Sequence, residues 1–386
     1  MSLVVTLSAN TSWYLYNFRK NTIISLIENG YKVVCICPND SYSEKLLSLG
    51  CDIQEININS SGSNPFSDMK LIFNILLIYK RLNPLAVFHF TIKNNVYGTI
   101  AASLLGIKSI NNISGLGSSF IHNNFKSNVA KFLYKKVLPF SYIVHVQNGD
   151  DKKLLEAIIP SIKKSIRLIP GSGVDVNRFS PDLKESKSSN SQIFKFLFAG
   201  RFISDKGLYE IIDSITVINS NEIKCEFWLI GFQDKSNISS INPSVINQWK
   251  SVPGLKIFEP TDELEKFLAQ VDCFVLPSYR EGMPKSILEA CSMSLPVICS
   301  NVPGCRNIVS ENFNGFLCEP KNSDSLRLAM EKMMHTTSEN RKILGKNGRE
   351  RVLKYFDEKI LIKEAISIVN DLASIAPHLN NIENKK

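Results

Sequence analysis

The sequence predicts an α/β protein made of two doubly wound domains in tandem, each with a parallel sheet that carries helices on both faces. Short apolar, β-branched segments alternate with segments whose apolar residues recur at helical spacing, which is the rhythm of β-α-β units. The 386 residues suffice for two or three domains. Near the middle, a segment rich in Ser, Pro and Lys at 179–192 interrupts the rhythm and is typical of a linker between domains.

The first domain is expected to span residues 1–180. A helical segment follows the first strand and ends at Gly30, a residue suited to a helix C-cap. A helix of small residues, TIAASLLG, is expected before the fourth strand. The strands of this domain are predicted at 3–9, 31–38, 85–91, 108–114, 141–148 and 165–171.

The second domain is expected to span residues 193–355. Residues 356–376 have helical periodicity and are expected to form a C-terminal helix that packs back on the first domain. The strands of the second domain are predicted at 194–200, 225–231, 255–259, 273–278, 296–300 and 315–319. Two such domains would face each other across a cleft lined by the carboxyl ends of both sheets, where open α/β folds bind ligands.

The cysteines and the N-terminus favour a cytoplasmic protein. Nine cysteines lie scattered in apolar segments without zinc-ligand spacing, so we expect buried free thiols in a reducing compartment. The apolar N-terminal segment lacks the features of a signal peptide and is interpreted as the first strand. No apolar segment is long enough to span a bilayer; the densest, at 71–79, contains Asn74.

The net charge of +9 belongs to the first half of the chain. Residues 1–180 contain 19 Lys and Arg against 10 Asp and Glu, and the other 26 cations are matched by the other 26 acidic residues. This asymmetry suggests that the first half faces an anionic partner, such as nucleic acid, an anionic membrane or a pyrophosphate. Nucleic acid is disfavoured because no element interleaves aromatic and basic residues. Solubility alone is the alternative.

Two loops after strands of the second domain carry charged side chains. RFISDKG places Arg201 and Lys206 at the end of one strand, with Gly207 opening the next helix, an arrangement that could hold a polyphosphate. Alternatively, Lys206 pairs with Asp205 on a solvated turn.

The second loop and the helix after it contain REGMPKSILEA, residues 280–290. Pro284 fits the first helical position, which would leave the N–H groups of Gly282 and Met283 available to a phosphate. Glu281 precedes this helix and Glu289 lies inside it, so the two carboxylates should contact different parts of one ligand.

Three motifs, in order, resemble the family-4 retaining glycosyltransferases of the GT-B fold, and the resemblance covers nearly the whole chain. They are the AGR…KG loop at 199–207, the E-G-M-P segment with its second glutamate, and NVPGCRNIVSENFNGFL at 301–317, where Asn307 stands at a position at which Glu is common. The first half also resembles bacterial enzymes that add GalNAc or a similar sugar to an undecaprenyl-diphosphate-linked sugar in O-antigen, capsule or glycan assembly. The segments that carry this second likeness are 8–23, 64–70, 90–98 and 110–120.

The resemblance implies a role for each residue of the donor site. Glu281 would hold hydroxyls of the donor sugar, and Glu289 the ribose hydroxyls of the nucleotide. Arg201 and Lys206 would neutralise the diphosphate leaving group. The other implied donor-binding residues are Gly200, Gly282, Met283 and Pro284. UDP-GalNAc, UDP-GlcNAc and UDP-Gal all remain possible donors. The chain contains no D-x-D motif, so neither a metal ion nor another cofactor is expected.

The first half is expected to hold the acceptor, a polyprenyl-diphosphate-linked saccharide. Many family members carry a site histidine after a strand of this domain, but INNISGLG has none at the corresponding place. His89 and His145 lie within strands and are interpreted as structural. The acceptor-side candidates are Asn17, Phe18 and Arg19, which are expected to open the first helix, and Lys93, Asn94, Asn112, Gly115 and Gly117.

Membrane contact is expected to be peripheral, on the inner face of the cell membrane. The segment at 125–140 mixes lysines with apolar residues, as helices on anionic lipid do. An ordinary surface helix is an equal alternative for this segment. For the whole chain, the rival functions are a UDP-sugar 2-epimerase-like enzyme of the same fold and a non-catalytic nucleotide-sugar-binding subunit of a transferase complex. Intact Arg201, Lys206, Glu281 and Glu289 disfavour the non-catalytic subunit.

Overall fold

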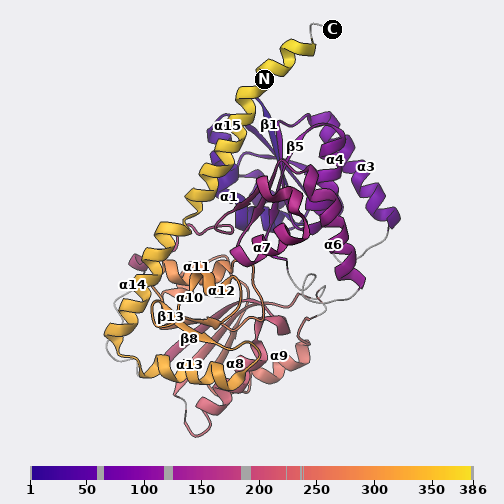
Figure 1. Ribbon diagram of the computed structural model, residues 1–386. Helices are drawn as coiled ribbons and strands as arrows, with labels where there is room; N and C mark the ends of the chain where they lie inside the picture. The colour runs from indigo at the N-terminus through magenta and orange to yellow at the C-terminus, as the bar shows by residue number, and fades with distance from the viewer. Residues whose placement is uncertain are drawn as a thin grey trace. The chain divides into compact units, whose positions relative to one another are not determined.

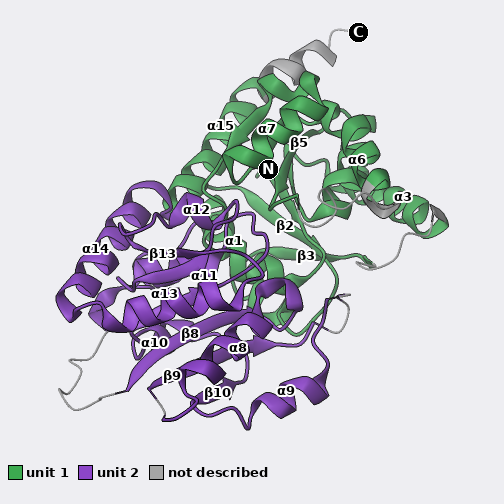
Figure 2. Ribbon diagram, turned by 60° about the horizontal axis from the view of Figure 1, so that its bottom comes forward, with its two compact units in different colours: residues 1–172, 359–386 green, residues 173–358 purple. Residues whose placement is uncertain are grey.

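The computed structural model divides the chain into two compact units. Unit 1 consists of residues 1–172 and 359–386, and unit 2 of residues 173–358 (Figure 2). The structure describes residues 2–58, 65–116, 125–183, 193–222, 224–234, 237 and 239–383. Each unit is built on its own parallel sheet, in agreement with the predicted doubly wound fold.

Unit 1 contains a seven-stranded sheet in the order β3-β2-β1-β4-β5-β6-β7, and every neighbouring pair of strands is parallel. The strand order reverses between β1 and β4. The central strands are buried on both faces because helices cover both, which explains their near-continuous apolar, β-branched sequences. The strands are β1 Val4–Ser8, β2 Lys32–Cys37, β3 Asp52–Glu55, β4 Ala86–Phe90, β5 Lys108–Ile113, β6 Ile143–Val146 and β7 Ile166–Leu168.

The helices of unit 1 pack on the two faces of this sheet. On one face, α1 and α15 share a core cluster with β1, β2 and β4; on the other, α3 and α4 pack against Ile36 and Val87 (Figure 1). The helical segments are α1 Ser12–Glu28, α2 Ser43–Leu47, α3 Pro65–Leu82, the π-helix η1 Asn94–Gly98, α4 Thr99–Leu104, α6 Phe125–Val137, the 3₁₀ helices η2 Leu138–Phe140 and η3 Pro160–Lys164, α7 Gly149–Ile158 and α15 Glu358–Glu383.

Unit 2 contains a six-stranded parallel sheet in the order β10-β9-β8-β11-β12-β13. Its order reverses between β8 and β11, so these neighbouring strands send their following loops to opposite sides. The strands are β8 Phe194–Arg201, β9 Cys225–Phe232, β10 Leu255–Phe258, β11 Cys273–Leu276, β12 Val297–Ser300 and β13 Gly315–Cys318.

The core of unit 2 is one large apolar cluster formed by its strands and helices. Within it, α8 and α11 bury Leu208, Ile211, Ile287 and Leu288 completely. The helical segments are η4 Pro181–Leu183, η5 Ser204–Lys206, α8 Leu208–Ile218, α9 Pro243–Trp249, α10 Leu264–Leu268, α11 Lys285–Ser292, α12 Cys305–Ile308, α13 Ser323–His335 and α14 Ser338–Tyr355.

The C-terminal helix α15 packs on unit 1. Its residues Ala365, Ile368, Val369 and Leu372 are buried in the same cluster as α1 and β1. The boundary between the units falls at residue 172 and not at residue 180, where the sequence suggests it. Residues 173–179 belong to unit 2 because Val174 pairs with Asp357 and because Phe179 packs in the unit 2 core. Most of the predicted linker, residues 184–192, lies outside the described residues.

All nine cysteines are buried free thiols, as predicted. Within the part of the chain that the structure describes, no helix combines the length and the hydropathy that crossing a bilayer requires.

Candidate active site

The predicted donor residues of unit 2 gather where β8 and β11 end. These two strands are neighbours at the point where the sheet order reverses, and ligands of open α/β sheets bind outside the strand ends at such points. Arg201 is the last residue of β8, and Lys206 ends the short helix η5 that follows. Glu281 lies in the loop between β11 and α11.

Lys206 and Glu281 form an ion pair between the two loops. Lys206 Nζ contacts Glu281 Oε1, and the two side chains are only 18% and 12% exposed. The sequence left open a pairing of Lys206 with Asp205, but Asp205 instead accepts a hydrogen bond from Ser239 Oγ at 3.2 Å. The structure therefore joins a cation and a carboxylate that are 75 residues apart in sequence.

Arg201 pairs with a carboxylate that the sequence analysis missed. Its Nη1 lies 2.8 Å from Asp234 Oδ2, and the arginine side chain is 45% exposed. Asp234 follows β9, the other neighbour of β8, so its position after a strand was the signal that could have revealed it. Gly200, next to Arg201, packs against the Phe198 ring: a Cβ added there would lie 3.1 Å from that ring.

Gly207 allows the loop after β8 to approach the end of β11. It adopts φ 74° and caps both η5 and α8. A Cβ at this position would lie 2.2 Å from the carbonyl oxygen of Pro277, a contact that backbone atoms cannot relieve. The Tyr279 N–H also donates to the Asp205 carbonyl at 2.9 Å. These contacts explain how the Lys206 loop reaches Glu281.

Helix α11 begins one residue later than the sequence suggests. Pro284 is its N-cap, with φ −72° and ψ 110°, and the first helical residue is Lys285. The correction follows from ψ, which is extended at Pro284; its carbonyl then accepts from the Ile287 N–H at 3.2 Å. Gly282 and Met283 precede the helix as predicted, and Met283 packs partly buried against the core of unit 2.

Gly304, the N-cap of α12, packs closely against the backbone of the Glu281 loop. It adopts φ 84°, and a Cβ there would lie 2.7 Å from the carbonyl oxygens of both Glu281 and Gly282. Asn307 Oδ1 accepts from the Gly304 N–H at 2.9 Å. Asn307, the residue that differs from the common family Glu, therefore stabilises the turn that contacts the Glu281 loop.

Glu289 is buried in α11, with an exposed fraction of 9%. Burial raises the pKa of this carboxyl, and the neighbouring charges of Lys285 and Arg178 oppose that effect. The Lys285 Nζ lies 3.9 Å from Glu289 Oε1, one helical turn away. A buried carboxylate with cations nearby suits a pair of hydrogen bonds from neighbouring ligand hydroxyls.

Two further side chains at the end of β11 were not predicted. Tyr279 Oη donates to Glu210 Oε1 of α8 at 2.7 Å, a second link between the two loop regions. The Ser278 hydroxyl is fully buried and has no hydrogen-bond partner among the described residues. Their places directly after a buried strand were the only sequence signal.

In unit 1, three acceptor-side candidates lie where a pyrophosphate could not meet their N–H groups. Asn17, Phe18 and Arg19 were expected to open the first helix, but α1 begins at Ser12, and the Thr11 hydroxyl caps it by accepting from the Tyr14 N–H at 3.1 Å. The three residues therefore lie in the second turn, where backbone N–H groups are bonded within the helix.

The side chains of these three residues have local partners or lie in the core. Asn17 Nδ2 donates to the Trp13 carbonyl at 3.0 Å, and the Phe18 ring packs against Trp13 and Tyr14. Arg19 is 2% exposed, and its guanidinium lies 4.3 Å from the centre of the Phe90 ring.

The remaining candidates of unit 1 lie within or after β5, or after β4. Lys93 Nζ donates to Asp68 Oδ1 of α3 at 2.9 Å. The buried Asn94 accepts from Ser8 Oγ, and the buried Asn112 donates to the His89 carbonyl at 3.3 Å. Gly115 follows β5 with φ 129°. Gly117 lies outside the described residues.

His89 is a structural histidine, as interpreted from the sequence. It is fully buried between Tyr79 Oη at 2.8 Å from Nε2 and Asn111 Oδ1 at 2.8 Å from Nδ1. Burial lowers the pKa of His89 to about 4. Gly98 packs against the ring, so closely that a Cβ there would lie 2.4 Å from Nε2.

His145 is also buried, and burial lowers its pKa. Its Nδ1 lies 3.2 Å from Asn112 Oδ1. On the other side of the ring, Nε2 lies 3.7 Å from Glu364 Oε1.

Among the residues described here, no group of three or more His, Cys, Asp and Glu side chains is arranged to hold a metal ion.

Two family models match the chain, one in each half. The model described as "Glycosyl transferase 4-like" matches residues 4–148, and the model described as "Glycosyl transferases group 1" matches residues 179–351. The second match contains Arg201, Lys206, Glu281 and Glu289.

Curated relatives with named activities are similar over most of the chain. The N,N'-diacetylbacillosaminyl-diphospho-undecaprenol alpha-1,3-N-acetylgalactosaminyltransferase of Campylobacter jejuni is 27% identical over 92% of this chain and 95% of its own length. The UDP-Gal:alpha-D-GlcNAc-diphosphoundecaprenol alpha-1,3-galactosyltransferase of Escherichia coli is 26% identical over 75% of this chain and 76% of its own.

Among solved structures, sucrose-phosphate synthase from Thermosynechococcus elongatus matches with a TM-score of 0.80 and 17% identity, over 96% of this chain and 99% of that one. This likeness shows the fold.

Proposed function

We propose that this chain, a GT-B glycosyltransferase made of a glycosyl transferase 4-like domain and a glycosyl transferases group 1 domain, transfers an N-acetylhexosamine such as GalNAc. The donor is a UDP-sugar, and the acceptor is an undecaprenyl-diphosphate-linked saccharide used in O-antigen, capsule or glycan assembly. The relatives reported above support both choices, because one is named as a GalNAc transferase and both act on sugars linked to a diphosphate lipid.

The contact between Lys206 and Glu281 is the observation that carries this proposal. It joins the loops after two neighbouring strands at the point where the sheet order reverses, the place where a nucleotide ligand of this fold would lie. The donor brings both a diphosphate, which needs a cation, and a sugar, whose hydroxyls donate to a carboxylate. Bound donor would therefore separate the pair and satisfy each member with its own partner.

The remaining donor contacts follow from the same arrangement. Arg201, paired with Asp234 at 2.8 Å, supplies the second positive charge for the diphosphate. Glu289 accepts from the ribose hydroxyls, and the backbone around Gly282 and Met283 contacts the distal phosphate and the sugar. Arg201 ends β8, Glu289 lies within α11, and Gly282 and Met283 lie in the loop just before α11, so these groups are positioned before the donor binds.

In the reaction, the bond between the anomeric carbon and the phosphate oxygen breaks, and its electron pair leaves with UDP. The negative charge that develops on the departing diphosphate is stabilised by Lys206 and Arg201, while Glu281 stabilises the positive charge that develops on the sugar. The acceptor hydroxyl forms the new bond on the same face of the sugar, and its proton passes to the departing phosphate oxygen. The configuration of the anomeric carbon is thereby retained. We propose that this chemistry requires no metal ion.

Unit 1 is proposed to bind the acceptor at the membrane. Its residues include most of the basic half of the chain. On α6, Lys135 and Lys136 are exposed beside Phe132, which is 59% exposed. A helix with lysines around an exposed aromatic residue suits an anionic lipid surface.

A donor screen tests the proposed function. The purified protein is incubated with a synthetic undecaprenyl-diphosphate saccharide and, in turn, UDP-GalNAc, UDP-GlcNAc and UDP-Gal, and the lipid product is weighed by mass spectrometry. We expect the mass of the acceptor to increase by one N-acetylhexosamine. An unchanged acceptor together with an epimerised UDP-sugar would instead indicate an epimerase.

A further inference from the structure

The six most exposed large apolar side chains among the described residues all belong to unit 1. Their exposed fractions run from 59% to 84%, whereas the most exposed one in unit 2, Leu328, reaches 57%. They are Phe66, Met69, Leu104, Phe140, Phe73 and Phe132. Single exposed apolar residues are ordinary, but a concentration on one side of a protein marks an interaction surface.

Three of the six lie on α3 and form a stripe along it. Phe66, Met69 and Phe73, together with Leu77, are 84%, 68%, 59% and 47% exposed. Their spacings of three, four and four residues place them on one face of the helix. The opposite face of α3 is buried: Leu71, Ile75, Ile78 and Tyr79 pack in the core of unit 1. The outward face of α3 therefore exposes apolar side chains that do not pack in the core of unit 1.

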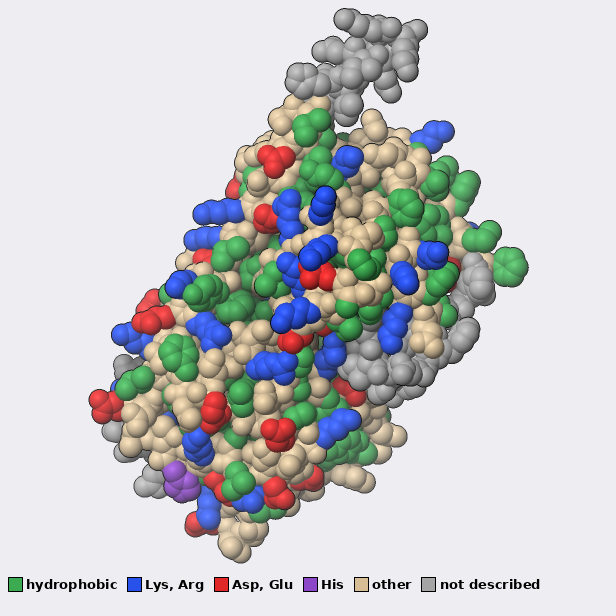
Figure 3. Space-filling view, in the orientation of Figure 1, with side chains coloured by type: hydrophobic (Ala, Val, Ile, Leu, Met, Phe, Trp, Pro, Cys, Tyr) green, Lys and Arg blue, Asp and Glu red, His purple; other side chains and the backbone are tan. Residues whose placement is uncertain are grey.

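Cations flank this stripe. Lys70, Lys80 and Arg81 are exposed on α3. Lys70 and Arg81 lie along one edge of the stripe, and Lys80 continues its line at the C-terminal end of the helix. The acidic residue in the first turn, Asp68, lies away from the stripe and accepts a hydrogen bond from Lys93 Nζ at 2.9 Å. The space-filling view shows this combination of hydrophobic and basic side chains at the edge of unit 1 over α3 (Figure 3). An apolar stripe flanked by Lys and Arg is the pattern of a helix that lies in the interface of an anionic bilayer.

We propose that the outward face of α3 inserts into the headgroup region of an anionic membrane and anchors unit 1 there. This inference rests on the proposed function, which places the lipid-linked acceptor at that membrane. It goes further by assigning the main apolar insertion to α3, in addition to the lysines and Phe132 of α6. The stripe adds the apolar contribution that charge alone does not give, since lipid binding strength grows with buried apolar area as well as with charge.

Helix α6 lies near α3, so that both can meet one surface. The π-helix η1 contacts α3 and α6, and both helices lie on the same side of unit 1 in two views (Figures 1 and 2). Phe132 on α6 and Phe140 after it are 59% and 67% exposed. Lys136 Nζ lies 5.9 Å from the centre of the Phe132 ring, so the second helix repeats the pairing of an apolar side chain with a cation.

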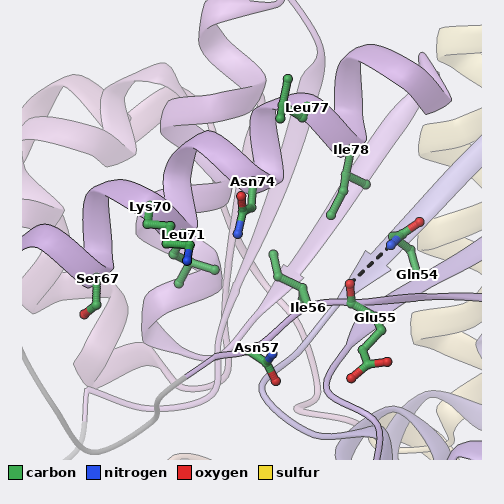
Figure 4. Close-up of a pocket in the computed structure, with 10 residues that line it drawn as sticks. All are labelled: Gln54, Glu55, Ile56, Asn57, Ser67, Lys70, Leu71, Asn74, Leu77 and Ile78. Atoms are coloured by element: carbon green, nitrogen blue, oxygen red, sulfur yellow. Dashed lines mark hydrogen bonds between the residues drawn. The ribbon is translucent and has the colours of Figure 1, made fainter.

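A groove beside the stripe fits the same occupant. It has a volume of ≈ 630 Å³ and lies between α3 and the end of β3. Figure 4 shows Leu71 and Ile78 of α3 across the groove from Ile56, with Lys70 and Asn74 on the same helix as the two apolar residues. Leu77 belongs to both the stripe and the groove wall. Six of its ten lining residues are polar and four are apolar, so the groove suits the polar headgroup region beside the stripe and not the acyl chains.

The first test places a fluorescent label on the stripe. All nine natural cysteines are buried, so Phe73→Cys offers an accessible thiol for a polarity-sensitive dye. With vesicles of phosphatidylcholine and phosphatidylglycerol, we expect a blue shift at position 73, and quenching by lipids brominated on their acyl chains. The same label at Leu328→Cys in unit 2 is expected to show neither effect. A label at position 73 that stays in water while the protein is bound would overturn the proposal.

The second test removes the apolar side chains. Met69→Ser combined with Phe73→Ser is expected to weaken vesicle binding at least about tenfold, because both side chains lose apolar area that the lipid would bury. The binding that persists at high salt should fall most, since salt screens only the lysines. The matched control, Leu328→Ser with Ile343→Ser, removes two side chains that are 57% and 51% exposed in unit 2 and should bind as the parent does.

Transfer assays separate this inference from the proposed function. The α3 variant should glycosylate a short-chain, water-soluble acceptor at the parent rate and a vesicle-embedded acceptor more slowly. If the parent glycosylates neither acceptor, the proposed function fails, while vesicle binding without donor still tests α3. If the variant binds vesicles like the parent, or instead loses self-association measured by sedimentation, the face does not insert in lipid and the proposal is overturned.

Discussion

Substituting Glu281 and Glu289 one at a time tests the proposal that the first binds the donor sugar and the second the nucleotide. Glu281→Gln keeps the size of the side chain but removes the charge beside the reacting sugar. Because that charge is expected to matter most as the anomeric carbon becomes cationic, kcat should fall by roughly 10²-fold, the effect of losing one preorganised electrostatic contact.

The ion pair between Lys206 and Glu281 predicts how Glu281→Gln changes the affinity for UDP. In the parent, a diphosphate has to compete with Glu281 for Lys206, and both side chains are less than a fifth exposed. Removing the carboxylate charge ends the competition, which for such a partly buried pair is on the order of 1 kcal/mol. UDP should therefore bind the Glu281→Gln protein as well as the parent, or up to about fivefold more tightly.

Glu289→Gln should impair nucleotide binding more than turnover, the reverse of what is expected for Glu281→Gln. The ribose contact is similar in the ground state and the transition state, so the donor KM should rise while kcat changes less. Losing one charge-assisted hydrogen bond, about 1.5–3 kcal/mol, should weaken UDP binding by roughly 10- to 100-fold.

The assays are calorimetry with UDP and steady-state kinetics, with Glu311→Gln as a control. Glu311 pairs with Lys332 on the surface of unit 2, so its substitution should leave both measurements unchanged. The division of roles is refuted if both site variants lose UDP binding equally, or if Glu281→Gln retains full turnover.

Three other predictions concern metal, membrane charge and acid stability. Turnover should survive EDTA; a loss that Mn²⁺ or Mg²⁺ restores would contradict neutralisation of the diphosphate by side chains alone. Replacing Lys131, Lys135 and Lys136 by Gln should weaken binding to anionic vesicles, and added salt should weaken that of the parent; salt-insensitive binding would count against the charge argument. Burial lowers the pKa of His89 to about 4, so its stabilising effect should be complete above about pH 6.5 and lost as the pH falls toward 4, by about 3 kcal/mol. In chemical unfolding, His89→Gln should lose less stability than the parent across that range, and equal losses would refute the assignment.

The sequence placed the loops after β8 and β11 correctly because their signals are local. Gly207 caps α8 as expected, Arg201 ends β8 and Lys206 follows that strand. The pair that Lys206 forms with Glu281 was not predictable in the same way. It depends on β8 and β11 being neighbours and on the close approach of Gly207 to Pro277, and neither is encoded in a short segment.

The start of α1 was predicted too late because its cap was overlooked. Thr11 satisfies the Tyr14 N–H, and an aromatic first turn hides the helical period that becomes clear only farther along the helix. Consequently Asn17–Arg19 were assigned to a helix start, although they lie in its second turn.

The exposure of α3 also depends on packing that the sequence does not show. The segment at 71–79 is the densest apolar stretch of the sequence, yet Phe73 is 59% exposed and Tyr79 is fully buried. Only the position of the helix on the sheet decides which apolar side chains face outward.

The most direct test of the proposed function follows UDP and the glycosylated lipid together in one reaction. The protein is mixed with UDP-GalNAc and a synthetic undecaprenyl-diphosphate saccharide, and both products are quantified over time by chromatography and mass spectrometry. A glycosyltransferase of the proposed kind forms the two products in equal amounts, and UDP does not accumulate when the acceptor is omitted. UDP formation that is independent of acceptor, or an acceptor that never gains an N-acetylhexosamine from any UDP-sugar, would contradict the proposed reaction.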